Sequence, residues 1–262
     1  MIIDANTHPT PDGRWFNTNL DASLPTLLKQ LDQAGIDKAI ITPFEGFVSN
    51  KFTIESAKKY PDRLIPGISF NPTLFNNLDE VFSEFYEEYD GLDIPIVKLH
   101  NRLHQYQLSD PRLVAFLEAN DNAKRPFIIF ICGLLTSKDI PFQTTPPQLF
   151  HSIASRFQKT KFVIMHAGMS WAMMIFEAIK DFPNVSMDLS FVQSKYRETS
   201  ISLDLKYLCK YYDKRIIFGS DFPEINIMQA KNDFNYLTSD LDEIKLKNIK
   251  YQNIQNLIFS RL

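Results

Sequence analysis

Short apolar runs alternate with amphipathic helical stretches along almost the whole sequence, and no linker-like segment interrupts them. Such alternation favours a parallel sheet whose strands are joined by crossover helices. Runs with strand character lie at residues 2–6, 38–42, 64–70, 94–99, 127–132, 161–165, 185–189 and 215–219. Helical stretches accompany them at residues 24–34, 53–60, 79–89, 111–120, 147–157, 171–182, 201–211 and 227–237.

The matching numbers of strands and helices predict an α/β fold, a (β/α)8 TIM barrel that forms one domain over residues 1–262. The length fits this fold, because such barrels take roughly 250 residues. An open doubly wound sheet uses the same alternation, so the choice between the two folds depends on motifs. A C-terminal helical extension, residues 241–262, is expected to pack against the outside or the base of the barrel.

Composition indicates which kinds of ligand and cellular partner the chain is suited to bind. The formal net charge of −3 gives no basic excess of the kind that attracts nucleic acid or anionic lipid. Cys132 and Cys209 form no cysteine framework, which favours a reducing cytoplasm. The first residues show no basic region followed by an apolar core, so we expect no export signal, and the longest apolar run, residues 126–135, is about half of what a membrane span needs. We expect a small-molecule substrate, no nucleic acid and no membrane, and a homodimer would be ordinary for such a barrel.

Polar residues follow four of the predicted strands at their carboxyl ends, where barrels of this kind build their active sites. The first strand runs into Asp-Ala-Asn-Thr-His at residues 4–8, and the fourth ends in Lys-Leu-His at residues 98–100. His166 follows the sixth strand, and Gly-Ser-Asp-Phe-Pro at residues 219–223 follows the eighth. We therefore expect His8, His166 and Asp221 to converge at one end of the barrel.

Taken in this order, the segments resemble the motifs of the amidohydrolase-related family of metal-dependent TIM-barrel hydrolases and decarboxylases. Members of that family carry Asp-x-His-x-His on strand one, Lys-Leu-His-Pro near strand four and a histidine on strand five. His-x-Gly follows on strand six, and Gly-Ser-Asp-x-Pro comes after strand eight. The matching segments are residues 4–8, 97–100, 166–168 and 219–223, with supporting similarity at 35–39, 60–63 and 109–113.

The resemblance implies roles for the residues that match. His8 would be a ligand of a divalent metal, zinc or manganese, and Asp221 would ligate the metal and take a proton from its bound water. His166 would orient or protonate the substrate. A divalent metal lowers the pKa of bound water toward neutrality, so an adjacent carboxylate can act as the general base.

The departures from the family pattern concern the metal ligands. Asn6 occupies the place of the first histidine, and an amide oxygen is a poorer zinc ligand than imidazole. The strand-five histidine is replaced by Phe130 or Ile131, depending on the alignment. Cys132 shares a strand face with Phe130 and could supply a thiolate ligand instead, although a cysteine in an apolar strand is more often a small buried hydrophobe. Lys98 and His100, which also share a face, are candidates for substrate binding.

These residues predict a hydrolase that acts on a small organic substrate, such as a lactone, an amide or a related carbonyl compound. In the leading interpretation a metal is held by His8 and Asp221 with Asn6 beside it, and Asp221 and His166 are the acid-base groups. A decarboxylase that uses the same site is one alternative. Others are metal-free catalysis by His166 and Asp221, and a catalytically degenerate barrel that binds a ligand.

Overall fold

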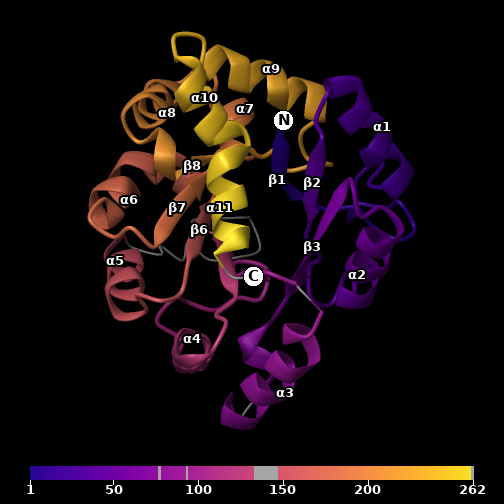
Figure 1. Ribbon diagram of the computed structural model, residues 1–262, viewed down its shortest axis with the longest axis vertical. Helices are drawn as coiled ribbons and strands as arrows, with labels where there is room; N and C mark the ends of the chain where they lie inside the picture. The colour runs from indigo at the N-terminus through magenta and orange to yellow at the C-terminus, as the bar shows by residue number, and fades with distance from the viewer. Residues whose placement is uncertain (76–77, 93, 133–146, 261–262) are drawn as a thin grey trace.

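The computed structural model describes residues 1–75, 78–92, 94–132 and 147–260. Eight parallel strands follow one another around a single sheet in sequence order, as Figure 1 shows. The strands are β1 (Ile3–Thr7), β2 (Lys38–Ile41), β3 (Leu64–Ser69), β4 (Ile96–Leu99), β5 (Ile128–Cys132), β6 (Phe162–Met165), β7 (Val185–Asp188) and β8 (Ile216–Ile217). The predicted α/β barrel is therefore confirmed, and each strand lies within its predicted range or extends one residue beyond it.

The sheet closes where the last strand meets the first. The backbone N–H of Ala5 donates to the carbonyl of Phe218 at 3.0 Å, and that of Asp221 donates to the carbonyl of Asn6 at 2.9 Å. The backbone N–H of His8 donates to Phe222 at 2.9 Å. The chain after β8 thus continues along β1 and brings the two motif-bearing segments into direct contact.

Helices cover the outside of the strands. The main ones are α1 (Leu24–Ala34), α2 (Asn50–Lys59), α3 (Leu78–Asp90), α4 (Pro111–Asn122), α5 (Pro147–Arg156), α6 (Ala172–Ile179), α8 (Ser200–Tyr211) and α9 (Ile227–Leu237). Shorter turns are η1 (Pro72–Leu74), η2 (His166–Trp171), α7 (Val192–Lys195) and η3 (Asp213–Arg215). Helix α1 illustrates the local signals: the Ser23 hydroxyl accepts from the N–H of Thr26, and Gly35 ends the helix at φ 61°, which glycine adopts without strain.

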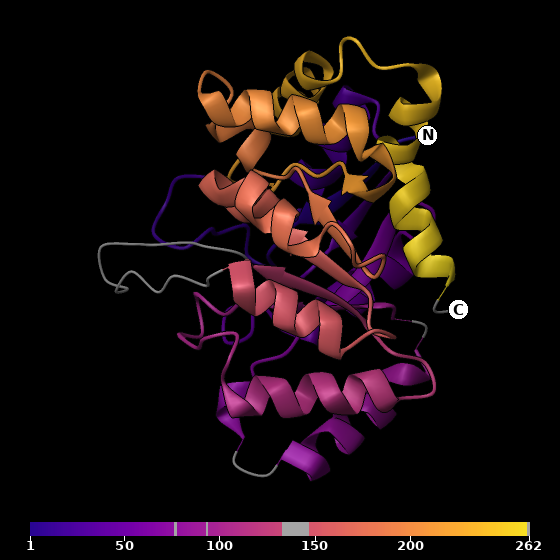
Figure 2. The ribbon, with the colours of Figure 1, turned by 90° about the vertical axis from the view of Figure 1, so that its left-hand side faces the viewer.

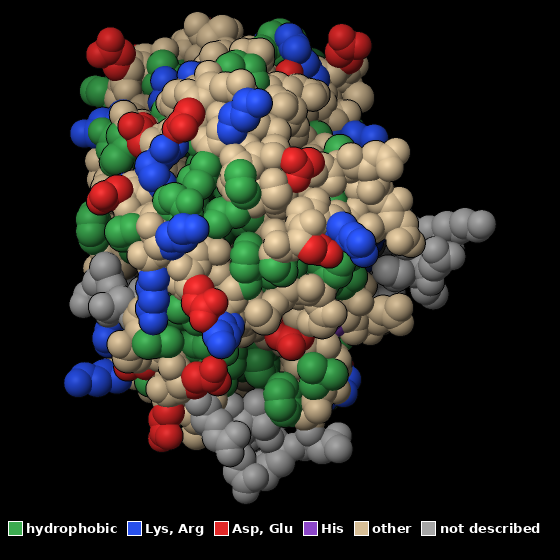
Figure 3. Space-filling view, turned by 90° about the vertical axis from the view of Figure 1, so that its right-hand side faces the viewer, with side chains coloured by type: hydrophobic (Ala, Val, Ile, Leu, Met, Phe, Trp, Pro, Cys, Tyr) green, Lys and Arg blue, Asp and Glu red, His purple; other side chains and the backbone are tan. Residues whose placement is uncertain are grey.

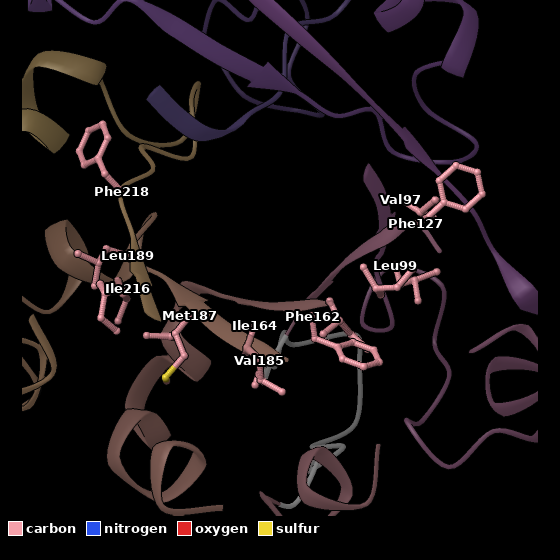
Figure 4. Packing of buried hydrophobic residues seen from close by; sticks show 14 of the residues in the cluster. Val97, Leu99, Phe127, Phe162, Ile164, Val185, Met187, Leu189, Ile216 and Phe218 are labelled. Carbon is pink, nitrogen blue, oxygen red and sulfur yellow. The ribbon is translucent and has the colours of Figure 1, made fainter. Parts of the chain in front are cut away.

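Side chains of each strand alternate between two apolar layers. The outer layer packs against the helices and includes Val97 and Leu99 of β4 and Ile164 of β6, as Figure 4 shows. The inner layer fills the barrel and includes Ile96 and Phe130. Because the strand period is two, Lys98 shares the inward face of β4 with Ile96. This register aims a lysine into the barrel.

The C-terminal extension closes the base of the barrel. It comprises α10 (Glu243–Lys247), η4 (Asn248–Gln252) and α11 (Asn253–Phe259), and Figure 2 shows it lying on one side of the molecule near both termini. Ile254 belongs to the inner apolar layer, and the Asn253 side chain donates to the carbonyl of Ile216 at 2.7 Å. The prediction that this segment packs on the outside or base is correct, and the opposite rim is left for the site.

On the face that carries α1 and α2, charged side chains do not gather into a patch of one sign. Lys and Arg side chains are interspersed there with Asp and Glu, as Figure 3 shows. Among the helices that the structure describes, none is long and apolar enough to span a bilayer.

Candidate active site

A cavity of about 450 Å³ opens at the carboxyl ends of the strands. It is lined by Trp15, Phe16, Phe44, Lys98, His100, Arg102, Leu103, His166, Phe191, Asp221 and Glu224. The predicted site residues Lys98, His100, His166 and Asp221 are therefore brought together, although they come from three separate strand ends. His8 and Asn6 lie directly behind this lining and are buried.

Lys98 is at the centre of the polar cluster. Its side chain is 1% exposed, and its ammonium nitrogen Nζ lies 3.1 Å from Oδ1 of Asn6 and 2.9 Å from Nε2 of His8. The Phe44 ring lies 4.8 Å from the same nitrogen, at cation–π distance. Burial lowers the pKa of Lys98, although Cys132, Asp221 and Asp188 oppose this shift. Two of the three ammonium protons are thus donated to Asn6 and His8, and the third is left for the cavity.

The hydrogen bonds of His8 define its tautomer. Nδ1 lies 2.8 Å from the carbonyl oxygen of Thr42, which can only accept, so Nδ1 carries the proton. Nε2 then accepts from Lys98. Burial lowers the pKa of His8 to about 4, and the neighbouring Lys98 cation adds to this shift. The separation of 3.4 Å between Nε2 and Oδ1 of Asp221 is therefore a close approach of a neutral ring and not an ion pair.

Asp221 is the ionised group of the cluster. Its Oδ1 accepts from the Asn6 amide nitrogen at 2.7 Å, and the same nitrogen donates to the Ser190 hydroxyl at 3.0 Å. Burial raises the pKa of Asp221, but His166, His8 and Lys98 outweigh it, and the pKa is held below its usual range. Asp221 is therefore a carboxylate at working pH, with Asn6 and Lys98 providing its polar surroundings.

His166 is held by the carbonyl end of β7. Its Nδ1 lies 2.9 Å from both the carbonyl oxygen and the hydroxyl of Ser190. Because the carbonyl only accepts, Nδ1 carries the proton, and Nε2 is the ring nitrogen that neither Ser190 group binds. The backbone N–H of His166 donates to Asp188 at 2.5 Å. The ring is thus fixed in position at the cavity wall.

Both acid-base candidates have strained backbones. His166 has φ 57° and Asp221 has φ 74°, in the left-handed region that non-glycine residues seldom adopt. Such conformations persist only where surrounding contacts hold them, and they cluster at functional sites. This observation supports a role for both residues beyond packing.

A second buried carboxylate supports the closure of the barrel. Oδ1 of Asp4 accepts from the backbone N–H of Ser220 at 2.8 Å and from that of Asn6 at 3.2 Å. Burial raises the pKa of Asp4 to about 7, although these hydrogen bonds lower it. Asp4 therefore ties the strand-one motif to the strand-eight motif and does not line the cavity.

The remaining predicted residues divide into two groups. His100 lines the cavity, and its Nδ1 accepts from the backbone N–H of Leu103 at 3.1 Å, which leaves the Nε2 proton as a donor. Burial, helped by Lys98, lowers the pKa of His100 well below its ordinary value. Cys132 lies instead in the inner apolar layer, and burial raises the pKa of its thiol to about 11. Cys132 is not among the residues that line the cavity.

Aromatic rings form the upper wall. Trp15 stacks on His8 with ring centroids 5.8 Å apart, and Phe44 lies 4.4 Å from the same ring. The Trp15 indole N–H donates to Glu224 at 2.5 Å. Trp15 and Phe16 thus give the cavity an apolar wall, whereas Trp171 does not line it.

The residues present do not fit a divalent metal. Across the described ranges, no group of three or more His, Cys, Asp or Glu side chains is arranged to hold a metal ion. The donor atoms of Asn6 and His8 that the motif would aim at a metal are hydrogen-bonded to Lys98. Ligation of a metal by His8, Asn6, Cys132 and Asp221 thus stays a prediction, and this arrangement does not favour it.

Three residues in and around the site were not predicted from the sequence. Asp188 and Ser190 lie at the end of β7, and the same strand-end rule could have found them. Arg102 lines the cavity, and its buried Nε atom has no hydrogen-bond partner within the described part of the chain. No motif pointed to Arg102, because its place depends on the turn that follows β4.

Comparison with known proteins supports the family assignment. The family model described as Amidohydrolase matches residues 3–243. No curated protein matches the chain. An uncharacterised TIM-barrel protein, Bb4693 from Bordetella bronchiseptica, has 20% identity and a TM-score of 0.80, with 99% of each chain covered.

Two similar structures have described activities. A probable 2-pyrone-4,6-dicarboxylic acid hydrolase from Acinetobacter baumannii has 16% identity, a TM-score of 0.66 and coverage of 98% of this chain and 99% of its own. A 5-carboxyvanillate decarboxylase from Novosphingobium aromaticivorans, solved with bound manganese, has 12% identity, a TM-score of 0.73 and coverage of 99% and 97%. Similar folds thus include both hydrolases and decarboxylases. With a family model that spans nearly the whole chain and a closed eight-stranded barrel, the protein belongs to the amidohydrolase family.

Proposed function

We propose that this protein is a hydrolase that opens a lactone, or cleaves a related ester or amide, of a small planar organic acid. The observation that carries the proposal is that an ionised Asp221 and the Lys98 ammonium line the same cavity. Hydrolysis of a carbonyl compound needs a base for water and a positive donor for the developing oxyanion, and these two groups supply both.

Asp221 is the general base. Its Oδ1 is held by Asn6, and no donor in the described part of the chain hydrogen-bonds to its Oδ2. Water attacks the carbonyl carbon while Asp221 takes one of its protons. Nε2 of His166 accepts a hydrogen bond from the same water and orients it, a role that requires the neutral ring.

Lys98 stabilises the oxyanion. As the carbon–oxygen double bond opens, its electron pair moves onto the oxygen, which receives the third Lys98 proton as a charged hydrogen bond. The tetrahedral intermediate then collapses, the bond to the leaving oxygen or nitrogen breaks, and the leaving atom takes the proton held by Asp221. The balance is one water consumed, with one carboxylic acid and one hydroxyl or amine group formed.

The cavity lining indicates the substrate class. Trp15, Phe44 and Phe191 offer flat apolar surfaces, which suit a planar ring. Arg102 adds a guanidinium whose Nε is unpartnered among the described residues, and a guanidinium binds carboxylates well. The similar structure described as a 2-pyrone-4,6-dicarboxylic acid hydrolase acts on a cyclic ester that bears carboxylates, which agrees with this class.

A panel of aromatic and unsaturated lactones, esters and amides, with and without a carboxylate, tests the proposal. Purified protein should hydrolyse the carboxylate-bearing members, with proton release followed by a pH indicator. Asp221→Asn should lower kcat by about 10²–10⁴-fold. Asp62→Asn, an exposed control, should leave kcat unchanged. Release of carbon dioxide from aromatic carboxylic acids, without hydrolysis of any panel member, would contradict the proposal in favour of decarboxylation.

A further inference from the structure

The side chain of Lys98 lies among the residues that the family motifs reserve for a metal. Asn6 and His8 occupy the two ligand positions of the strand-one motif, and Asp221 occupies that of the strand-eight motif. Nζ of Lys98 lies 3.1 Å from Oδ1 of Asn6 and 2.9 Å from Nε2 of His8. The atoms that would face a metal ion therefore face an ammonium group.

The fold holds the ammonium there. Lys98 pairs with Ser69 of β3 and Phe130 of β5 in the sheet register, and its side chain shares the inward face with Ile96. It is among the largest fully buried side chains of the protein, and the Phe44 ring covers its charged end at 4.8 Å. A buried charge needs a partner, and the Asp221 carboxylate beside Asn6 supplies the opposite charge.

The replaced ligands agree with this arrangement. An amide at position 6 accepts from Lys98 through its oxygen and donates to Asp221 through its nitrogen, whereas an imidazole in its neutral form has one donor and one acceptor on a rigid ring. Phe130, one of the two residues at the strand-five ligand position, lies in the inner apolar layer. The departures from the metal-binding motif thus match the needs of an internal cation.

We propose that the Lys98 ammonium, with Asn6 and Phe130 in place of metal-ligating histidines, occupies the cation position of this amidohydrolase barrel and excludes a divalent metal from it. The charge that a metal would supply to the carbonyl oxygen is then built into the chain. A metal entering the site would have to displace the ammonium from His8 and Asn6 and would meet its positive charge. The inference deepens the proposed function, because it names the source of the electrophile.

Metal binding tests the proposal without any substrate. Zn²⁺ and Mn²⁺ are titrated by calorimetry into wild-type protein, Lys98→Ala and the exposed control Lys58→Ala, after chelator treatment and removal of the chelator. Lys98→Ala should bind zinc about tenfold or more tightly than wild type and Lys58→Ala, because the ammonium is gone and His8 and Asp221 are free. The gain should vanish in Lys98→Ala/Asp221→Asn. Equal zinc affinity in wild type and a folded Lys98→Ala would overturn the proposal.

The metal content of the wild-type protein provides a second, independent test of the proposal. Metal content is measured by mass spectrometry on protein expressed with added zinc and manganese. We expect the bound metal to be less than about a tenth of an equivalent per chain, because an ammonium closes the site. One equivalent of metal that is lost in Asp221→Asn would overturn the proposal, even if no Lys98 variant folds. Neither test depends on hydrolysis, so failure of the substrate panel would not be confused with failure of this inference.

Discussion

The Lys98 ammonium donates to Nε2 of His8 over 2.9 Å, while Nδ1 of the same ring donates to the carbonyl of Thr42. Burial, helped by Lys98, keeps His8 neutral, so its Nε2 accepts from the ammonium and one Lys98 proton is left for the cavity. We therefore propose that His8 is a positioning residue for Lys98, and that the chemistry depends on the charge that it orients.

Removal of the Lys98 charge should lower the rate of hydrolysis. In Lys98→Met a side chain of similar length remains but the positive donor to the oxyanion is lost. Loss of one preorganised donor of this kind lowers kcat by about 10²–10³-fold. Steady-state kinetics on the best panel substrate measures this, with Lys58→Met as the exposed control. An unchanged kcat in a folded Lys98→Met would mean that another group carries the oxyanion.

Two substitutions of His166 should distinguish the chemical role of its imidazole from the effect of its left-handed backbone conformation on stability. His166 has φ 57°, which asparagine tolerates better than alanine. His166→Asn should fold with a melting temperature close to wild type and lose about 10²-fold in kcat, because Nε2 no longer orients the water. His166→Ala should show the same kinetic loss and an additional loss of stability. Thermal unfolding and kcat are measured together, and wild-type kcat in His166→Asn would exclude the proposed role.

The stability of the fold should depend on pH through Asp4. The pKa of Asp4 is raised by burial to about 7, so folding favours its protonated form. Its contribution is complete below the ordinary pKa near 4 and is lost as the pH rises through about 7. Relative to wild type, Asp4→Asn should gain stability over this range, on the order of a few kcal/mol, because the amide oxygen still accepts from Ser220. Urea unfolding at pH 5 and pH 8 measures it, and a pH-independent difference between the two proteins would refute the role of Asp4.

Arg102 should determine affinity for anionic ligands. Its Nε has no hydrogen-bond partner within the described residues, so a substrate carboxylate gains a donor there without displacing one. Arg102→Met should raise the inhibition constants of small aromatic carboxylates about tenfold or more, with little effect on uncharged analogues. Arg156→Met removes an exposed guanidinium at the end of α5 and serves as the control. Equal weakening of charged and uncharged inhibitors would mean that Arg102 acts through packing alone.

Much of the barrel could be predicted from sequence, because the alternation of buried strands and amphipathic helices is a local property. Helices α1 and α9 begin and end at their predicted residues. Among the strands, the largest difference concerns β8, predicted at residues 215–219 and observed at Ile216–Ile217. Backbone hydrogen bonds to Ile249 and to β1 interrupt the regular pairing there, and these partners are distant in sequence.

The composition of the site could be predicted only in part. Residues at strand ends, such as His166 and Asp221, follow from the barrel and its motifs. The contacts of Lys98 do not, because they depend on the closure of β1 against β8, which places Asn6 and His8 beside the fourth strand. Arg102 and Ser190 depend on turn geometry, which a single sequence does not specify.

Anomalous scattering shows whether a metal ion or the Lys98 ammonium lies between Asn6, His8 and Asp221. Crystals grown with excess Mn²⁺ are measured near the manganese edge, and the map is inspected between Asn6, His8 and Asp221. If the ammonium occupies the cation position, we expect no anomalous peak there. Density for the Lys98 ammonium should lie within hydrogen-bond distance of His8. A manganese peak bonded to His8 and Asp221, with the Lys98 side chain turned away, would contradict the proposal.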